Sequence, residues 1–353
     1  MSSAATKRAL ALRYIDIGVN FTDPVFRGRH RGSQKHPDDF DDMMKRSAAA
    51  GVKTMIITGG SLKESREALK LAEETGLYAT AGCHPTRSKE FETYRGGPEQ
   101  YLQALDKLIS EHLTGKGRVV AIGECGLDYD RLNRAPISTQ KPHFRSQLAL
   151  AKKYNLPLFL HSRAAHSDLV SILREEGFGV NGGRGAGARG GVVHSFTGKK
   201  EEMEELIEMG FHISINGCGL KSQENLEVTK AIPLDKLMLE TDAPWCTLTS
   251  THASRQHIST LPPVLNNLYF PPSCKPERFV PGQMVKGRNE PCAIGGVAWV
   301  IAQLKGVPLE DVVEAAWKNT VQVFGLDDMV QLEREPAPSK QEFDAKKEEW
   351  PSL

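Results

Sequence analysis

Four residues that can bind a metal ion or transfer a proton stand at the ends of apolar runs: Glu124, His161, His194 and Asp242. Any one of them alone is more often structural, so the argument rests on the four together. Polar groups that converge in a buried place are costly unless something satisfies them. A mixed carboxylate and imidazole set suits Zn²⁺, Mn²⁺ or another borderline cation, whereas Mg²⁺ prefers oxygen ligands. We therefore predict a divalent metal site (Mg²⁺, Mn²⁺ or Zn²⁺) with one or two ions per chain.

Alternating apolar runs and helix-like segments must position these residues. The predicted strands are Tyr14–Asn20, Val52–Thr58, Tyr78–Gly82, Arg118–Glu124, Pro157–His161, Gly191–Ser195, Phe211–Asn216 and Lys236–Asp242. Helical patterns follow them at Asp38–Ala50, Lys63–Thr75, Gln100–His112, Gln140–Tyr154, His166–Glu176, Lys200–Met209 and Asn225–Ala231, with two more at Pro291–Leu304 and Leu309–Phe324. Parallel strands need crossover connections, and eight such units favour a closed α/β barrel over an open doubly wound sheet. We predict a (β/α)8 TIM barrel of the metal-dependent hydrolase type, with its reactive residues at the carboxyl ends of the strands.

One barrel domain is expected over residues 1–326, followed by an acidic peripheral tail over residues 327–353. The stretch 247–289 departs from the alternation of strands and helices. It is rich in Pro, Ser, His and aromatic residues and is predicted to be a long loop on the catalytic face. A loop of that length is uncommon in a compact domain unless it is functional.

Composition limits the classes of protein that remain. Lys and Arg total 45 and Asp and Glu total 44, so the net charge is +1 and any attraction for a polyanion must be local. Six scattered cysteines without a Cys-x-x-Cys pair favour a reducing compartment. No stretch has the pattern of a secretory signal or approaches the roughly 18 apolar residues of a membrane span. We expect a monomer without a membrane partner, inside the cell in the cytoplasm, the nucleus or both.

Several segments resemble the signatures of TatD-type deoxyribonucleases. They are Asp-Ile-Gly-Val-Asn-Phe-Thr-Asp (16–23), Gly-Cys-His-Pro-Thr (82–86), Gly-Glu-Cys-Gly-Leu-Asp-Tyr-Asp-Arg (123–131), His-Ser-Arg (161–163), Val-Val-His-Ser-Phe-Thr-Gly (192–198), Leu-Glu-Thr-Asp-Ala-Pro-Trp (239–245) and Arg-Asn-Glu-Pro (288–291). The resemblance runs from about Tyr14 to Phe324 and is strongest to the eukaryotic branch. It implies a metal-dependent deoxyribonuclease, expected to be a 3'–5' exonuclease with endonuclease activity and with links to DNA repair and DNA fragmentation.

The resemblance also assigns roles to individual residues. Glu124, His161, His194 and Asp242 carry over as metal ligands. Glu124 and Asp242 are the candidate catalytic residues, with Glu124 anchoring the cation and Asp242 accepting a proton from water. His84 and Arg163 are candidate phosphate-binding residues, although a structural turn before Pro85 is the alternative for His84. The remaining candidates are Asn20 and Arg131 for substrate binding, and Asp16 and Asp128 behind the ligands.

Strand 1 departs from the wider metallohydrolase superfamily. Its end reads Gly18-Val19-Asn20, where that superfamily has His-x-His. This difference leaves open whether two ions bind tightly or one binds well and a second arrives with substrate.

DNA is the expected partner, either single-stranded or at duplex ends, and it requires cations near the mouth of the barrel. Backbone contacts from cations give salt-sensitive affinity, and interleaved aromatic rings can stack on unpaired bases. The alternative for each charged loop is an ordinary solvated surface. The candidate residues are Arg27, Arg29, His30 and Arg31 after strand 1, Arg131 and Arg134 after strand 4, and Arg255, Lys275, Arg278, Lys286 and Arg288 beside Tyr269, Phe270 and Phe279 in the long loop.

Two other functions compete with the nuclease. An amidohydrolase-like enzyme acting on a small-molecule ester or amide is the alternative on the same barrel, because a fold alone does not select a substrate. The basic loops and the missing His-x-His argue against it. A non-catalytic nucleic-acid-binding module is the other alternative, and the intact set of four ligands argues against it.

Overall fold

The computed structural model describes residues 12–326 and Met329, so the predicted tail over 327–353 lies, apart from Met329, outside the described residues. All eight predicted strands are present, and the fourth continues past Glu124 to Asp128. They are β1 (Tyr14–Val19), β4 (Val52–Ile57), β5 (Tyr78–Ala81), β6 (Val119–Asp128), β7 (Leu158–Arg163), β8 (Gly191–Val193), β9 (His212–Ile215) and β10 (Leu237–Leu239).

The strands form one parallel sheet in chain order, and its two edges meet. Val19 forms a parallel bridge with Ala243, just beyond the end of β10. The backbone N–H of Asp242 donates to the carbonyl of Gly18 at 2.9 Å, and the N–H of Asn20 donates to Ala243 at 2.8 Å. These contacts join β1 to the chain after β10, and the structure is the predicted (β/α)8 TIM barrel.

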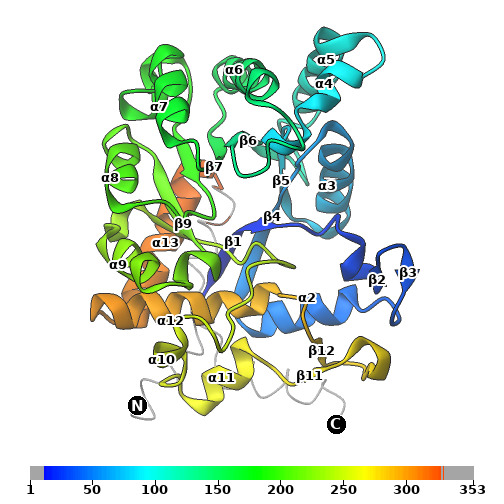
Figure 1. The fold of residues 1–353 in the computed structure, drawn as a ribbon. Coiled ribbons are helices and arrows are strands. Elements are labelled where there is room, and N and C mark those ends of the chain that lie inside the picture. The colour runs from blue at the N-terminus through cyan, green and yellow to red at the C-terminus, as the bar shows by residue number, and fades with distance from the viewer. Residues whose placement is uncertain (1–11, 327–328, 330–353) are drawn as a thin grey trace.

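Helices surround the strands (Figure 1). Those that follow the predicted pattern are α2 (Phe40–Ala49), α3 (Leu62–Thr75), α5 (Gly97–Glu111), α6 (Ile137–Tyr154), α7 (His166–Glu175), α8 (Lys200–Glu208), α9 (Gln223–Ala231), α12 (Ile294–Lys305) and α13 (Leu309–Phe324). The short α4 (Lys89–Thr93) was not predicted.

Helix α3 shows how local sequence sets these elements. Ser61 caps its first turn by accepting a hydrogen bond from the N–H of Glu64, and Gly76 ends it in the left-handed conformation. Leu62, Ala68 and other small or apolar residues at helical spacing are buried against the sheet.

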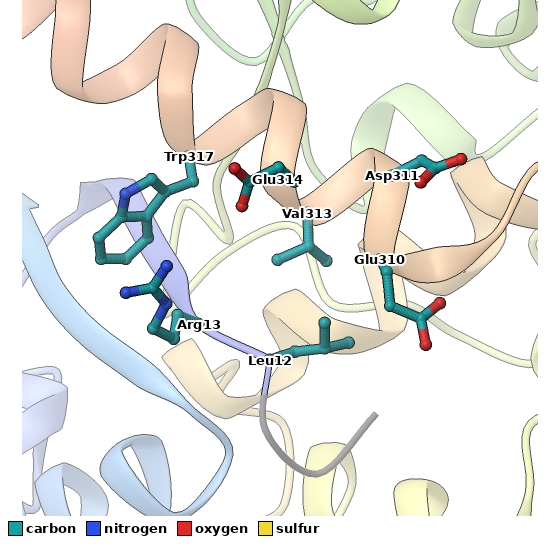
Figure 2. A pocket seen from close by; sticks show the side chains of 7 residues that line it. All are labelled: Leu12, Arg13, Glu310, Asp311, Val313, Glu314 and Trp317. Atoms are coloured by element: carbon teal, nitrogen blue, oxygen red, sulfur yellow. The ribbon is translucent and has the colours of Figure 1, made fainter. Parts of the chain in front are cut away.

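The amino-terminal end of the barrel is closed by α13. Inward-facing residues of the strands, among them Ile15 and Phe159, pack in one core cluster with Trp317 and Val321 of this helix. The guanidinium of Arg13, the residue before β1, lies over the Trp317 ring at 4.8 Å. Figure 2 shows the pocket of about 340 Å³ at this place, which is also lined by Glu310, Asp311 and Glu314. It lies at the start of β1, the end opposite to the metal-ligand candidates.

The stretch 247–289, which the sequence analysis predicted to be a long loop on the catalytic face, is not loop throughout. This stretch contains two short helices, α10 (Arg255–Ile258) and α11 (Pro263–Tyr269), and the short strands β11 (Ser273–Cys274) and β12 (Met284–Val285). Trp299 of α12 donates its indole N–H to the carbonyl of His257 at 3.1 Å. Tyr269 is fully buried, and its hydroxyl lies 2.8 Å from that of Tyr14 at the start of β1. Part of the stretch therefore packs on the flank of the barrel, away from the catalytic face.

Among the described residues, no single helix is long and apolar enough to cross a membrane. The segments Pro291–Lys305 and Leu309–Phe324 pass that test only as a pair, by length and composition, with a bend of 116° between them.

Candidate metal centre

Glu124 is the centre of a cluster at the carboxyl ends of the strands. Its Oε1 lies 2.9 Å from Nδ1 of His161, 2.7 Å from Nε2 of His194 and 3.3 Å from Nε2 of His84. The ligand atoms of His84, Glu124 and His161 all lie within 4.8 Å of one another. The sequence predicted that Glu124, His161, His194 and Asp242 converge, and the structure brings the first three into direct contact.

A glycine in the motif allows this arrangement. Gly126 has φ 139°, and a Cβ there would lie 2.0 Å from the carbonyl oxygen of His161. The close approach keeps β6 and β7 in register, with Gly126 opposite His161. Glu124 and His161 therefore lie side by side on neighbouring strands.

The electrostatics of the cluster are those of a cation site. Burial raises the pKa of Glu124, but His194, His84 and His161 outweigh burial and leave that pKa well below its usual range. Burial lowers the pKa of His194, but Glu124 and Glu240 outweigh it and raise that pKa. Three imidazole rings thus face one buried carboxylate oxygen, an arrangement in which a divalent cation satisfies every group at once.

In His161 and His194, the ring nitrogen that does not face Glu124 provides a test of whether these residues fit a metal ion. His161 Nε2 lies 3.4 Å from Asp128 Oδ2, and His194 Nδ1 lies 3.6 Å from Glu240 Oε2. Neither buried nitrogen forms a hydrogen bond with any described residue. A ligating histidine usually turns its second nitrogen toward a carboxylate, which fixes the ring and raises its basicity. The donor set and its surroundings therefore fit a divalent metal ion.

Asp242 lies beside this cluster. Its Oδ1 accepts a hydrogen bond from Asn20 Nδ2 at 2.8 Å, and its Oδ2 accepts one from Cys246 Sγ at 3.2 Å. Burial raises the pKa of Asp242 to about 6, with the charge of His194 opposing that shift. Asp242 is thus close enough to His194 for their charges to interact. It lies outside the group formed by His84, Glu124 and His161, whose ligand atoms are within 4.8 Å of one another.

His84 has the structural role that the sequence analysis gave as its alternative, and it also lies in the cluster around Glu124. Its Nδ1 accepts a hydrogen bond from the N–H of Thr86 at 3.1 Å and so caps the turn that begins at Pro85. Its Nε2 points at Glu124, and its ring lies 4.4 Å from that of His161. His84 therefore lies among the candidate metal ligands, although the sequence placed it with the phosphate-binding residues.

Asp16 and Asp128, which the sequence analysis placed behind the ligands, contact Thr241 and His161 respectively. Burial raises the pKa of Asp16 to about 8, and its carboxylate accepts hydrogen bonds from the N–H and hydroxyl of Thr241 at 3.0 and 2.5 Å. Asp16 thereby fixes the residue before Asp242. Asp128 is buried and faces His161, and Gln140 holds its backbone N–H at 2.8 Å.

The predicted substrate-binding residues occupy different places. Arg163 ends β7 and is half-buried, and its Nε has no hydrogen-bond partner among the described residues. Arg131 is exposed, with Nε 4.0 Å from Asp128. Asn20 donates to Asp242, so it orients a carboxylate at the position where the wider superfamily has a histidine.

Glu240 is a residue of this site that the sequence analysis missed. It is fully buried, and its Oε1 accepts hydrogen bonds from the N–H of Ser195 at 2.6 Å and from Asn216 Nδ2 at 2.9 Å. The signal was present in the sequence: Glu240 lies two residues before Asp242, which is the spacing of side chains on the same face of a strand.

The predicted basic and aromatic rim is smaller than expected. Arg288 is buried and bonds Asp39 and Glu290 at 2.6–2.8 Å, so it cannot contact DNA. Two of the three aromatic rings expected to stack on bases already pack within the protein, because Tyr269 is buried and Phe279 stacks on His36 at 5.0 Å. The exposed cations that remain after β1 and β6 are Arg29, Arg31, Arg131 and Arg134.

One exposed ring near the site was not singled out from the sequence. Trp245 is 56% exposed, although its backbone is held by the N–H bond to Asp242 at 2.9 Å and by Asn289 Nδ2, which donates to its carbonyl at 2.8 Å. An exposed indole on a fixed backbone is able to stack on a base.

The closed parallel barrel and the carboxylate–imidazole cluster at its carboxyl end define a metal-dependent hydrolase. A family model described as TatD related DNase matches residues 15–325, and the chain belongs to that family of deoxyribonucleases.

Individual relatives agree with this assignment. Deoxyribonuclease Tat-D of Schizosaccharomyces pombe is 45% identical over 325 residues, covering 92% of this chain and 99% of the relative. A protein of Erwinia amylovora named 3'-5' ssDNA/RNA exonuclease TatD is 33% identical, covering 88% of this chain and 99% of the relative. The crystal structure of an uncharacterized amidohydrolase from Saccharomyces cerevisiae superposes with a TM-score of 0.79 at 33% identity, over 88% of this chain and 99% of that one.

Proposed function

We propose that the chain is a metal-dependent 3'–5' exonuclease that hydrolyses DNA phosphodiester bonds, with endonucleolytic cleavage as a secondary activity. The observation that carries the proposal is the buried Glu124 oxygen surrounded by His84, His161 and His194 at 2.7–3.3 Å. The name of the Erwinia amylovora relative supports the polarity and a preference for unpaired strands.

Glu124, His161, His194 and Asp242 would hold the cation, with His84 as a further candidate. A divalent ion held there lowers the pKa of water and polarises a phosphoryl oxygen. Asn20 donates to one oxygen of Asp242 and so aims the other, which accepts the proton of the attacking water. At the end of β1 this chain has Asn20, which donates to Asp242, where the wider superfamily has two histidine ligands. We therefore propose one tightly held ion, of the Mg²⁺, Mn²⁺ or Zn²⁺ class, and a second that arrives with substrate.

The rest of the mouth binds the nucleic acid. Arg163 presents a planar guanidinium with a buried, unbonded Nε, which suits a phosphate oxygen. Trp245 offers an exposed ring to an unpaired base, and Arg131 offers a cation to the backbone. Single strands and frayed duplex ends are therefore the proposed substrates.

The cellular setting is also a proposal. We propose a monomer that acts in the cytoplasm or nucleus, and the six free cysteines are compatible with a reducing compartment. Roles in DNA repair and DNA fragmentation follow from the proposed activity.

The test is cleavage of single-stranded and duplex DNA labelled at either end, with Mg²⁺, Mn²⁺, Zn²⁺ or EDTA. We expect release of mononucleotides from the 3' end, faster on single strands and abolished by EDTA. Turnover of a panel of small esters and amides in the absence of any DNA cleavage would favour the amidohydrolase-like alternative and refute the proposal. Products released from the 5' end would refute only the polarity.

A further inference from the structure

Two thiols meet beside the candidate metal centre. Cys218 begins the short helix η4 (Cys218–Leu220) after β9, and Cys246 lies in the turn after β10. Their Sγ atoms are 2.7 Å apart, and both residues are free and half-buried. Thiols in contact at a partly exposed place are open to a small oxidant.

The backbone holds the two thiols in contact independently of any bond between them. A Cβ at Gly217 would lie 2.0 Å from the carbonyl oxygen of Cys246, so the two turns touch directly. The N–H of Cys218 donates to Asn216 Oδ1 at 2.9 Å, and Asn216 Nδ2 bonds the buried Glu240. A disulfide, with S–S of about 2.05 Å, is therefore reached by a small movement of two side chains.

The same pair touches a proposed ligand. The thiol of Cys246 donates to Asp242 Oδ2 at 3.2 Å, while Asn20 donates to the other oxygen at 2.8 Å. Oxidation of Cys246 removes the S–H and leaves Oδ2 without this orienting bond. Losing a partner that orients a ligating carboxylate typically costs about 10- to 100-fold in metal affinity or activity.

We propose that Cys218 and Cys246 form a reversible disulfide that lowers the activity of the metal centre through Asp242. With hydrogen peroxide as oxidant, one thiolate attacks a peroxide oxygen and breaks the O–O bond, which gives a sulfenic acid and a hydroxide that takes the proton lost by the thiol and leaves as water. The second thiol displaces that hydroxyl as water and closes the S–S bond. Two thiols lose two electrons and two protons, and hydrogen peroxide becomes two molecules of water. A dithiol reductant restores both thiols by thiol–disulfide exchange.

The other cysteines provide the controls. Cys83, Cys125 and Cys292 are buried, and Cys274 is half-buried, with Sγ 3.3 Å from the N–H of Val280. Cys218→Ser removes the pair without touching a candidate ligand. Cys274→Ser is the matched control, because it removes a half-buried thiol of β11 that does not contact another cysteine.

The experiment treats metal-loaded protein with hydrogen peroxide, maps disulfide-linked peptides by mass spectrometry, and measures DNA cleavage before and after dithiothreitol. We expect a Cys218–Cys246 link in wild type and Cys274→Ser, with a roughly tenfold or larger loss of kcat/KM that dithiothreitol reverses. In Cys218→Ser, peroxide leaves the ratio of oxidised to reduced activity near one.

Three results would overturn the proposal: no 218–246 link in the peptide map, a link with unchanged cleavage, or an equal loss in Cys218→Ser. The cleavage readout rests on the proposed DNA hydrolysis, whereas the peptide map does not. A mapped link in a protein that cuts no DNA would therefore be a failure of the proposed function, distinct from a failure of the disulfide.

Discussion

Glu240→Gln changes one charge at a buried position behind the metal centre. The glutamine keeps the size of the side chain and an oxygen for the N–H of Ser195, which donates to Glu240 at 2.6 Å. What it removes is the negative charge 3.6 Å from His194 Nδ1, which raises the pKa of that histidine and its basicity as a ligand. Outer partners of metal-binding histidines are worth about 10- to 100-fold in metal affinity or activity. We expect a loss of that size, about 1.4–2.7 kcal/mol.

The assay for Glu240→Gln is calorimetric titration with Mn²⁺ or Zn²⁺, followed by cleavage kinetics at saturating metal. The matched control is Glu205→Gln, which makes the same change in the partly buried pair that Glu205 of α8 forms with His166 of α7 at 2.7 Å, outside the metal centre. Circular dichroism melting shows whether each variant is folded. Wild-type metal affinity in a folded Glu240→Gln variant, or an equal loss in Glu205→Gln, would refute the role given to Glu240.

Three further predictions concern stability and substrate binding. Arg288→Met removes one of the two guanidinium groups, those of Arg288 and Arg46, that pair with the buried carboxylates of Asp39 and Glu290. Urea unfolding is therefore expected to show a loss of about 3–5 kcal/mol, while Arg255→Met at an exposed site stays within about 0.5 kcal/mol. Equal effects of the two would contradict the buried ion-pair network. Burial, with Lys236 nearby, lowers the pKa of His212 to about 4, below its unfolded value of about 6.5. The folded state therefore binds fewer protons, and stability present above pH 6.5 falls as the pH drops toward 4, by about 3 kcal/mol in total. In His212→Gln this part of the pH dependence of unfolding is expected to disappear, and an unchanged pH profile would contradict the assignment. Trp245→Ala is expected to weaken single-stranded DNA binding by about 1–3 kcal/mol in fluorescence anisotropy, with Trp245→Phe retaining most of it. Equal binding by all three proteins would remove Trp245 from the substrate site.

Much of the barrel is predictable because its signals are local. Each strand is a short apolar run, and each helix has an apolar face at helical spacing, as in Leu62–Thr75. The ends of those runs then place Glu124, His161 and His194 at one mouth, since carboxyl ends of parallel strands meet. These positions can be predicted from the pattern of apolar runs and from the rule that the strand ends of a parallel barrel meet at one face.

The remaining features depend on contacts between distant segments. Tyr269 and Arg288 look like surface residues of a polar stretch, but partners far away in the chain bury them: Tyr14 for the first and Asp39 for the second. The helices of 255–269 are too short for periodicity to indicate. The meeting of Cys218 and Cys246 likewise follows from the packing of two turns, which spacing along the chain does not encode.

The central claim is that Glu124 anchors a divalent ion within a ring of imidazoles. The direct measurement is titration of metal-free protein with Mn²⁺ and Zn²⁺, comparing wild type with Glu124→Gln and with the control Glu205→Gln, which lies outside the metal centre. We predict at least a 100-fold loss of affinity and a loss of DNA cleavage in Glu124→Gln, with DNA binding and Glu205→Gln unaffected. Wild-type metal affinity in a folded Glu124→Gln variant would contradict the account.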